Sequence, residues 1–236
     1  MTDVGGLLQA HLSDWLGMWP PPPSQVVAVS CQWRARAGWD GQIHPFVGVA
    51  SPDGAVLSTP PAAVPKVSEL IAAASTEPGS GVSAVLDAVG ERLADLVWTG
   101  SKWGTGCFRW TDRPAGLEDV GEWVERDDPR VPEWLAPFNG EVLVAWDEDG
   151  RYAAGVGRKM HNQWGHELAV ATEERMQGRG LATRLVAQAA RQVLADGAVP
   201  TYLHSHRNRA SARVAEAAGF RERGWQTLGL WGRSEP

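Results

Sequence analysis

The chain has 236 residues, of which 43% are hydrophobic, and it carries a net charge of −6 at pH 7. This composition is typical of a globular protein, and the negative charge gives no support for nucleic acid or an anionic membrane as a partner. No stretch approaches the roughly 20 apolar residues that span a bilayer, and Asp3 and Asp14 argue against a signal peptide. Cys31 and Cys107 lie far apart with no metal-ligand spacing, so we expect no metal site and a reducing, cytoplasmic location.

The first hundred residues predict a small α/β domain. Apolar residues between Leu7 and Leu16 recur at helical spacing, and the proline run at 20–23 ends this helix. Beyond it the pattern predicts strands over 25–33 and 44–50, a hairpin over 44–58, and helices over 66–75 and 82–97. The stretch from Gly100 to Gly106 then breaks the pattern. We therefore predict two domains, at 1–104 and 105–236.

The second domain has the more regular pattern. An edge strand over 107–110 is followed by two short helices over 117–124 and 131–138, and then by strands over 141–146, 151–157 and 166–170. A helix begins near 180, a strand covers 201–204, a second helix runs from its N-cap Asn208 to Gly219, and residues 220–231 have strand character. This order predicts an α/β layer with its ligand site near the strand ends.

The segment between the strand at 166–170 and the following helix has the composition of an anion-binding loop. It reads Arg175-Met176-Gln177-Gly178-Arg179-Gly180 and ends where the helix begins. Glycines let a ligand approach the backbone, and the first turn of a helix offers unpaired N–H groups and the positive end of the dipole. The two arginines add positive charge, so the loop predicts a phosphate or pyrophosphate ligand without deciding between them.

This loop resembles the pyrophosphate loop of the GNAT superfamily of N-acetyltransferases, Arg/Gln-x-x-Gly-x-Gly/Ala, with Arg175, Gly178 and Gly180 at the matching positions. Downstream, Asn208-x-x-Ser211 followed by Gly219-Phe220 is similar to the coenzyme A-side helix of that superfamily. Two such matches, in the right order and separated by a helix and a strand, are specific. The resemblance covers about residues 105–236, and residues 55–70 could be a degenerate copy of the same strand-loop-helix unit.

The resemblance implies a GNAT-type mixed central sheet flanked by helices, preceded by the smaller α/β domain. It also implies acetyl-CoA as co-substrate and a primary amine of a small molecule or peptide as acceptor. Backbone groups of Leu168 and Val170 would align the pantetheine arm, and the amides from Gln177 to Leu181 would hold the pyrophosphate. The remaining expected cofactor contacts are Arg175, Arg179, Ala182, Asn208 and Ser211. The arginines around the second helix, Arg213 among them, are either a solvated face or a contact for the 3′-phosphate.

His166 and Glu167 are the candidates for the base that deprotonates the amine. His166 shares the strand parity of Leu168 and Val170, and His-x-Leu-Ala-Val resembles the base-bearing strand of some arylalkylamine acetyltransferases. Glu167 faces the other side unless a bulge intervenes. We prefer His166, with Glu167 second, and the third interpretation is that neither residue is a base.

One position departs from the superfamily pattern. Many GNAT enzymes carry a tyrosine seven residues after the helix asparagine, as acid for the leaving thiolate, and this chain has Ala215 there. Either another hydroxyl serves, with Ser211 nearest in sequence, or the thiolate leaves unassisted. The alternatives to an enzyme are a non-catalytic acyl-CoA-binding module and an interaction protein. Residues 1–104 could shape the acceptor pocket or form a homodimer interface, and the sequence does not decide between these two roles.

Overall fold

The computed structural model describes residues 3–75 and 81–232, and the chain separates into two compact units. Unit 1 combines residues 1–11 with 109–222, and unit 2 combines residues 12–108 with 223–236. The division near Phe108 lies close to the predicted boundary after residue 104. The structure differs from the sequence-based division at the two termini, because the first residues join unit 1 and the last residues join unit 2.

Unit 1 is built on a mixed sheet in which only one neighbouring pair of the named strands is parallel. Its order is β9-β8-β7-β6-β5, and the parallel pair is β8–β9. The strands are β5 (Glu122–Val124), β6 (Val142–Trp146), β7 (Tyr152–Asn162), β8 (Gly165–Thr172) and β9 (Val199–His204). The hairpin, the β8 strand and the β9 strand expected from the sequence are all present. They form the mixed central sheet that the sequence analysis predicted.

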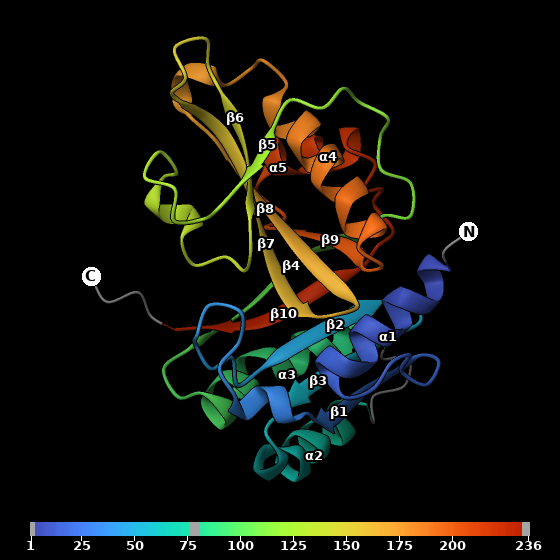
Figure 1. Cartoon of the computed structure of the whole chain (residues 1–236). Helices are drawn as coiled ribbons and strands as arrows, with labels where there is room; N and C mark the ends of the chain where they lie inside the picture. The colour runs from blue at the N-terminus through green and yellow to red at the C-terminus, as the bar shows by residue number, and fades with distance from the viewer. Residues whose placement is uncertain (1–2, 76–80, 233–236) are drawn as a thin grey trace. The chain divides into compact units, whose positions relative to one another are not determined.

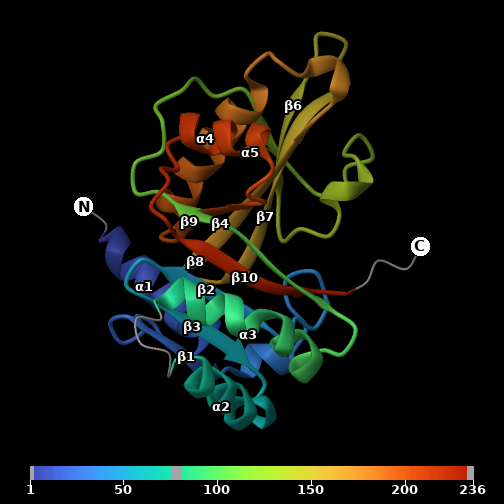
Figure 2. The same cartoon turned by 180° about the vertical axis from the view of Figure 1, so that it is seen from behind.

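Two helices, α4 (Leu181–Ala195) and α5 (Arg209–Ala217), complete unit 1, and Figure 1 shows α4 lying along this sheet. The buried face of α4 carries Leu185, Val186, Ala189 and Val193, which pack with Leu168 of β8 in one apolar core. Figure 2, the view from behind, shows α5 beside α4. The helix α4 was predicted from apolar spacing, and α5 from its N-cap Asn208 and Gly219. Asn208 is the N-cap of α5 as expected, because its Oδ1 accepts the N–H of Ser211 at 3.0 Å.

The segment that leads into β6 was predicted incorrectly. It contains the strand β5 and a short 3₁₀ turn at Glu133–Leu135 where the sequence suggested two short helices. Close packing explains the 3₁₀ turn, since the side chains of Leu135 and Phe138 occupy the space above Gly155 and Gly157 of β7. An added Cβ on Gly157 would lie 2.4 Å from the Phe138 ring, so the segment is fixed by contacts distant in sequence rather than by local propensity.

The N-terminal helix α1 (Val4–Leu16) contributes its first half to unit 1. The side chain of His11 is fully buried, and its Nδ1 lies 3.1 Å from Oδ1 of Asn162. The Nδ2 of Asn162 donates in turn to the carbonyl of His11 at 3.1 Å. The close approach requires a glycine, because a Cβ at Gly165 would lie 2.2 Å from Cγ of His11.

The strands of unit 2 follow the order β1-β3-β2-β10-β4 and are also of mixed direction. Its strands are β1 (Gln25–Ser30), β2 (Val47–Ser51), β3 (Gly54–Thr59), β4 (Lys102–Trp110) and β10 (Gln226–Trp231), and β1–β3 is the parallel pair. The helices α2 (Val64–Ala74) and α3 (Val82–Val97) share an apolar core with these strands. The predicted hairpin is the antiparallel pair β2–β3.

The proposed degenerate copy at residues 55–70 corresponds to β3 and the first half of α2. A strand is indeed followed by a short loop and a helix, as in β8–α4, and β3 also has a parallel neighbour. That neighbour is β1, which precedes β3 in the chain, whereas the parallel neighbour of β8 follows it. The connecting loop, residues 60–63, contains two prolines and no glycine, so it lacks the anion-binding character of the β8–α4 loop.

The stretch from Gly100 to Gly106, predicted as a break, belongs largely to strand β4. Its glycines accommodate a ring, because an added Cβ on Gly104 would lie 2.6 Å from the indole of Trp231. The strand β10, which contains Trp231, pairs antiparallel with both β4 and β2. This pairing is the physical reason why the end of the chain belongs to unit 2.

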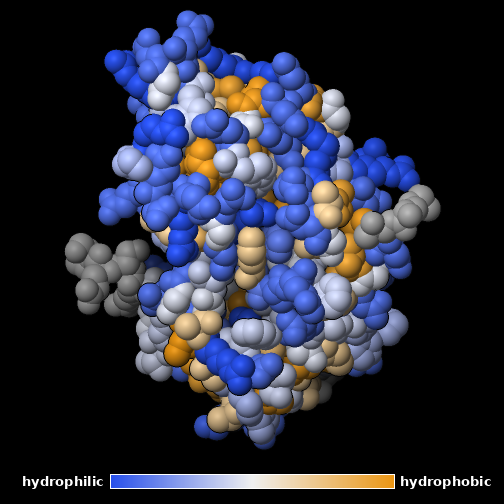
Figure 3. All heavy atoms as spheres, in the orientation of Figure 1, coloured by the Kyte–Doolittle hydropathy of each residue, from blue (hydrophilic) through white to orange (hydrophobic). Residues whose placement is uncertain are grey.

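Among residues 3–75 and 81–232, no helix is both long and apolar enough to cross a bilayer. The face drawn in Figure 3 is mainly hydrophilic, and its apolar residues form small separate groups.

Candidate active site

The loop between β8 and α4 is an open cradle of backbone amides. Gly178 and Gly180 have φ values of 78° and 74°, in the left-handed region that favours glycine. A Cβ added at either position would meet nothing within 4 Å. The first N–H groups of the 15-residue helix α4 have no intrahelical acceptor, and its N-cap Gly180 has no side chain to accept them. The geometry fits an anion held by backbone donors.

Strands β8 and β9 form a parallel pair over only three residues. The register joins Gly165–Glu167 to Val199–Thr201, and no further pairs follow. Beyond that point a cavity of about 590 Å³ lies between the end of β8, the glycine loop and α5. Its walls are formed by Val170, Ala171, Thr172, Met176, Gln177, Gly178, Gly180, Leu181, Ala182, Thr183, Tyr202, Asn208, Ala210, Ser211, Arg213, Val214 and Ala217. The size is typical of a small-molecule or cofactor pocket.

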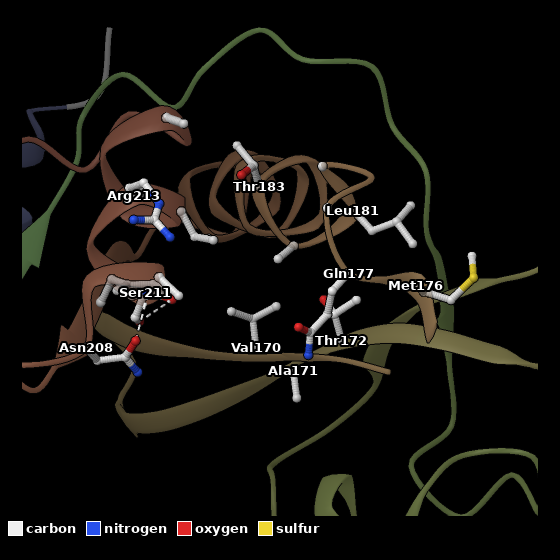
Figure 4. Close-up of a pocket in the computed structure, with 17 residues that line it drawn as sticks. Val170, Ala171, Thr172, Met176, Gln177, Leu181, Thr183, Asn208, Ser211 and Arg213 are labelled. Atoms are coloured by element: carbon white, nitrogen blue, oxygen red, sulfur yellow. Dashed lines mark hydrogen bonds between the residues drawn. The ribbon is translucent and has the colours of Figure 1, made fainter. Parts of the chain in front are cut away.

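Figure 4 shows how the polar side chains are distributed around this cavity. Asn208, Ser211 and Arg213 approach it from the α5 side, and Gln177 approaches from the glycine loop at the opposite end. Val170 lies between them, on the strand that forms the floor. A ligand in the cavity would therefore contact an amide-rich end and a cationic side chain.

Most of the residues expected to bind the cofactor line this cavity, but three do not. Leu168 is only 1% exposed and packs in the core beneath α4, so only its backbone is available to a ligand. Arg179 is exposed but is not part of the wall. Arg175 turns away from the cavity: its guanidinium donates to Oδ2 of Asp147 at 2.5 Å and to the carbonyl of Tyr152 at 2.7 Å. Arg175 thus ties the loop to the β6–β7 turn.

Sequence reasoning missed several residues of the wall. Ala210, Val214 and Ala217 recur at helical spacing on α5, so a helical projection from Asn208 would have found them, whereas Arg213 was already among the possible contacts for the 3′-phosphate. Tyr202 lies on β9, and no motif singles it out. Its hydroxyl lies 2.9 Å from Oγ of Ser211.

Glu167 is a buried carboxylate with two basic partners. It is 6% exposed, and its oxygens lie 2.5 Å from Nζ of Lys159 and 3.1 Å from Nε2 of His161. Burial by itself would raise the pKa of Glu167, but the charge of Lys159 and the hydrogen bond of His161 lower it to about 2.

The His161 ring is stacked on His11 with centroids 6.2 Å apart, and burial lowers the pKa of His11 to about 3.

His166 faces the opposite side of the sheet from Glu167. It pairs with Met160 of β7, whereas Glu167 pairs with Lys159. Burial, helped by the positive charge of Arg158, lowers the pKa of His166 to about 4, so the ring is neutral near pH 7. Its Nδ1 finds no hydrogen-bond partner among the described residues. Neither His166 nor Glu167 forms part of the cavity wall, which begins four residues after His166 on the same strand.

No group of three or more His, Cys, Asp or Glu side chains within residues 3–75 and 81–232 is arranged to hold a metal ion. The polar groups of the cavity wall are backbone amides, hydroxyls, the amide side chains of Gln177 and Asn208, and the guanidinium of Arg213.

Comparison with known proteins identifies the part of the chain that carries this site. Residues 105–220 match the sequence profile of the acetyltransferase (GNAT) family. This region is a GNAT-family acetyltransferase domain. The GNAT domain therefore contains β8, the glycine loop, α4, β9 and α5, which together form the whole cavity wall.

Solved structures resemble this chain over part of its length. A protein described as a GNAT-family acetyltransferase from Novosphingobium aromaticivorans is 26% identical with a TM-score of 0.48, and the match covers 58% of this chain and 69% of that one. A GNAT-family acetyltransferase from Colwellia psychrerythraea is 13% identical with a TM-score of 0.44, over 59% of this chain and 61% of that one. A search of curated proteins found no match.

Proposed function

We propose that this protein is an N-acetyltransferase that transfers the acetyl group of acetyl-CoA to a primary amine of a small molecule or peptide. The observation that carries the proposal is the cavity between the end of β8 and α5, closed at one end by the loop of Gly178 and Gly180. The membership of residues 105–220 in an acetyltransferase family supports the same reaction class. A cytoplasmic location, suggested by the cysteine usage, belongs to this proposal.

The residues of the cavity fit the chemistry of coenzyme A. The space above Gly178 and Gly180 is open to a pyrophosphate, which would accept hydrogen bonds from the unpaired N–H groups at the start of α4. Arg213 supplies a guanidinium on the same wall, suited to a phosphate. The end of β8 beyond Glu167 has no β9 partner in the parallel pairing, so the backbone of Val170 can bond to the pantetheine amides.

The acetyl donor supplies an activated carbonyl carbon, and the protein must present a neutral amine to it. Of the two candidate bases, Glu167 is already bonded to Lys159 and His161, so its oxygens are occupied, whereas the Nδ1 of His166 has no hydrogen-bond partner among the described residues. His166 is uncharged near neutral pH and can accept a proton. We therefore retain His166 as the preferred base, acting through water because it lies outside the cavity wall.

A non-catalytic acyl-CoA-binding module is the alternative. One observation favours it: Ala215, at the position where many GNAT enzymes carry a tyrosine, is fully buried and provides no proton donor. The two functions differ in a single measurable property, because both predict acetyl-CoA binding and only the enzyme predicts transfer to an amine.

The first test is calorimetric titration of the purified protein with acetyl-CoA, using the variants Gly178→Glu and Gly197→Glu. Both glycines have positive φ, 78° and 80°, with no atom within 4 Å of an added Cβ, and they flank the two ends of α4. The two substitutions therefore share the same backbone strain, and only Gly178→Glu places a carboxylate beside the phosphate cradle. We expect saturable binding by the wild type and by Gly197→Glu, and loss of binding in Gly178→Glu.

Absence of binding by the folded wild-type protein would refute the proposal. Release of free thiol from acetyl-CoA in the presence of a panel of amines then tests catalysis. Binding without amine-dependent thiol release would favour the non-catalytic module.

A further inference from the structure

Two hydroxyl groups that are hydrogen-bonded to each other belong to residues of the cavity wall. Tyr202 of β9 and Ser211 of α5 both line it, and Oη of Tyr202 lies 2.9 Å from Oγ of Ser211. The backbone N–H of Ser211 is held by Asn208, which fixes the first turn of α5. Tyr202 is only 2% exposed and packs against the Phe220 ring at a centroid distance of 5.7 Å. The Tyr202 hydroxyl is therefore held in place from two sides.

The position of Tyr202 follows from the strand register. The parallel pairing of β8 with β9 ends at Glu167 and Thr201, so the next residues, Leu168 and Tyr202, stand where the two strands part. The proposed function places the pantetheine arm and its thioester along the backbone of Leu168 and Val170. A sulfur atom bound at that point would lie next to Tyr202.

We propose that the Tyr202 hydroxyl, hydrogen-bonded to Ser211, is the proton donor for the departing sulfur of coenzyme A. This inference rests on the proposed function. It assigns the role that Ala215 cannot perform to a residue on a different element, a strand instead of the helix. Ser211 acts through Tyr202 and is a positioning residue.

The step balances without any further reactant. The amine nitrogen forms a bond to the carbonyl carbon, the carbon–sulfur bond breaks with its electron pair moving to sulfur, and Tyr202 gives its proton to that sulfur. The Ser211 hydroxyl passes a proton to the tyrosyl oxygen and recovers one from solvent. The proton lost by the amine leaves through the base, so one N–H is exchanged for one S–H.

The surroundings keep the Tyr202 proton available. Burial raises the pKa of Tyr202, while the Ser211 hydrogen bond and the Arg109 charge act in the opposite direction. Arg109 is itself engaged by Glu216 at 2.8 Å and by the carbonyl of Phe220 at 2.9 Å, so its charge is partly neutralised. The phenol therefore stays protonated at neutral pH and can act as a donor.

The test measures the thiol pKa of bound coenzyme A, by the ultraviolet absorbance of the thiolate across a pH titration. A donor that bonds to the thiolate lowers the thiol pKa of the ligand. We expect Tyr202→Phe to raise the thiol pKa of bound coenzyme A by about one pH unit relative to the wild-type complex, and Ser211→Ala to raise it by less. Tyr152→Phe, the change at the other tyrosine of the chain, is the matched control and should leave it unchanged.

A second arm follows amine-dependent thiol release. Tyr202→Phe should lower the rate by roughly 100-fold. This is the low end of the rate effects of general acids, because a thiolate leaves readily. The dissociation constant for acetyl-CoA should be unchanged. Equal thiol pKa values in the wild type and Tyr202→Phe would overturn the inference and leave the proposed function intact. Failure of the wild type to bind coenzyme A would overturn both.

Discussion

A methyl group at Gly165 provides a sharp test of how the N-terminal helix is held. The Cβ of Gly165→Ala would lie 2.2 Å from Cγ, 2.3 Å from Nδ1 and 2.6 Å from Cδ2 of His11. Carbon atoms in contact are normally about 3.5–4.0 Å apart, so the ring must move by more than an ångström. His11 cannot move easily because it is fully buried and bonded twice to Asn162.

We expect Gly165→Ala to lower the free energy of unfolding by about 3 kcal/mol, at the upper end for overpacking. In a protein of this size that corresponds to a fall of roughly 6–12 °C in Tm, measured by tryptophan fluorescence. Gly116→Ala is the control, since a Cβ at Gly116 meets nothing within 4 Å, and its Tm should change by less than about 2 °C.

Adding His11→Ala to Gly165→Ala removes the ring with which the methyl group collides. The double variant should be more stable than the sum of the two single effects predicts, by about 2 kcal/mol. Strict additivity, or a Tm for Gly165→Ala equal to that of Gly116→Ala, would refute the packing of His11 against Gly165. Coenzyme A affinity should be unchanged throughout, because neither residue lines the cavity.

Three other predictions concern the site and its charges. Arg175→Ala should raise the Kd for coenzyme A by roughly five-fold, because a partly exposed charged pair contributes about 1 kcal/mol to holding the loop; an unchanged Kd in calorimetry would show that the loop keeps its shape without this contact. His166→Gln should slow amine-dependent thiol release by about 100-fold at constant Kd for acetyl-CoA, and an unchanged rate would assign the ring a packing role. Stability should fall as pH falls below 6.5, because the folded chain holds the pKa of His11 at about 3 and of His166 at about 4, so the unfolded chain binds these protons first. The fall should continue below 4.5, the ordinary pKa of the Glu167 carboxyl, which the folded chain holds at about 2, and a Tm that is constant from pH 7 to pH 5 would contradict the histidine part.

Local sequence signals were sufficient to predict the segments whose backbone hydrogen bonds are made within the segment itself. The helix α3 was predicted with its observed bounds, 82–97, because its apolar residues recur at helical spacing. The Asn208 cap and the Gly178–Gly180 loop were also readable, since capping and positive φ depend on the residue type at one position. Of these local features, Gly178, Gly180 and Asn208 line the cavity.

Contacts between distant segments decided the remainder. The 3₁₀ turn at 133–135 is fixed by Phe138 and Leu135 against the glycines of β7, and the outward turn of Arg175 is fixed by Asp147, 28 residues earlier. The pairing of Tyr202 with Ser211 requires β9 and α5 to meet, which no spacing in the sequence encodes.

The sequence alone therefore determined the family, through the GNAT-like motifs, and the glycine loop before α4, because a positive φ depends on glycine at that one position. Only the tertiary structure decided which side chains surround the cavity and that the Glu167 carboxylate is already paired with Lys159 and His161. Hydroxyl pairs and buried ion pairs form between side chains that the fold brings together, so their chemistry depends on packing and not on order along the chain.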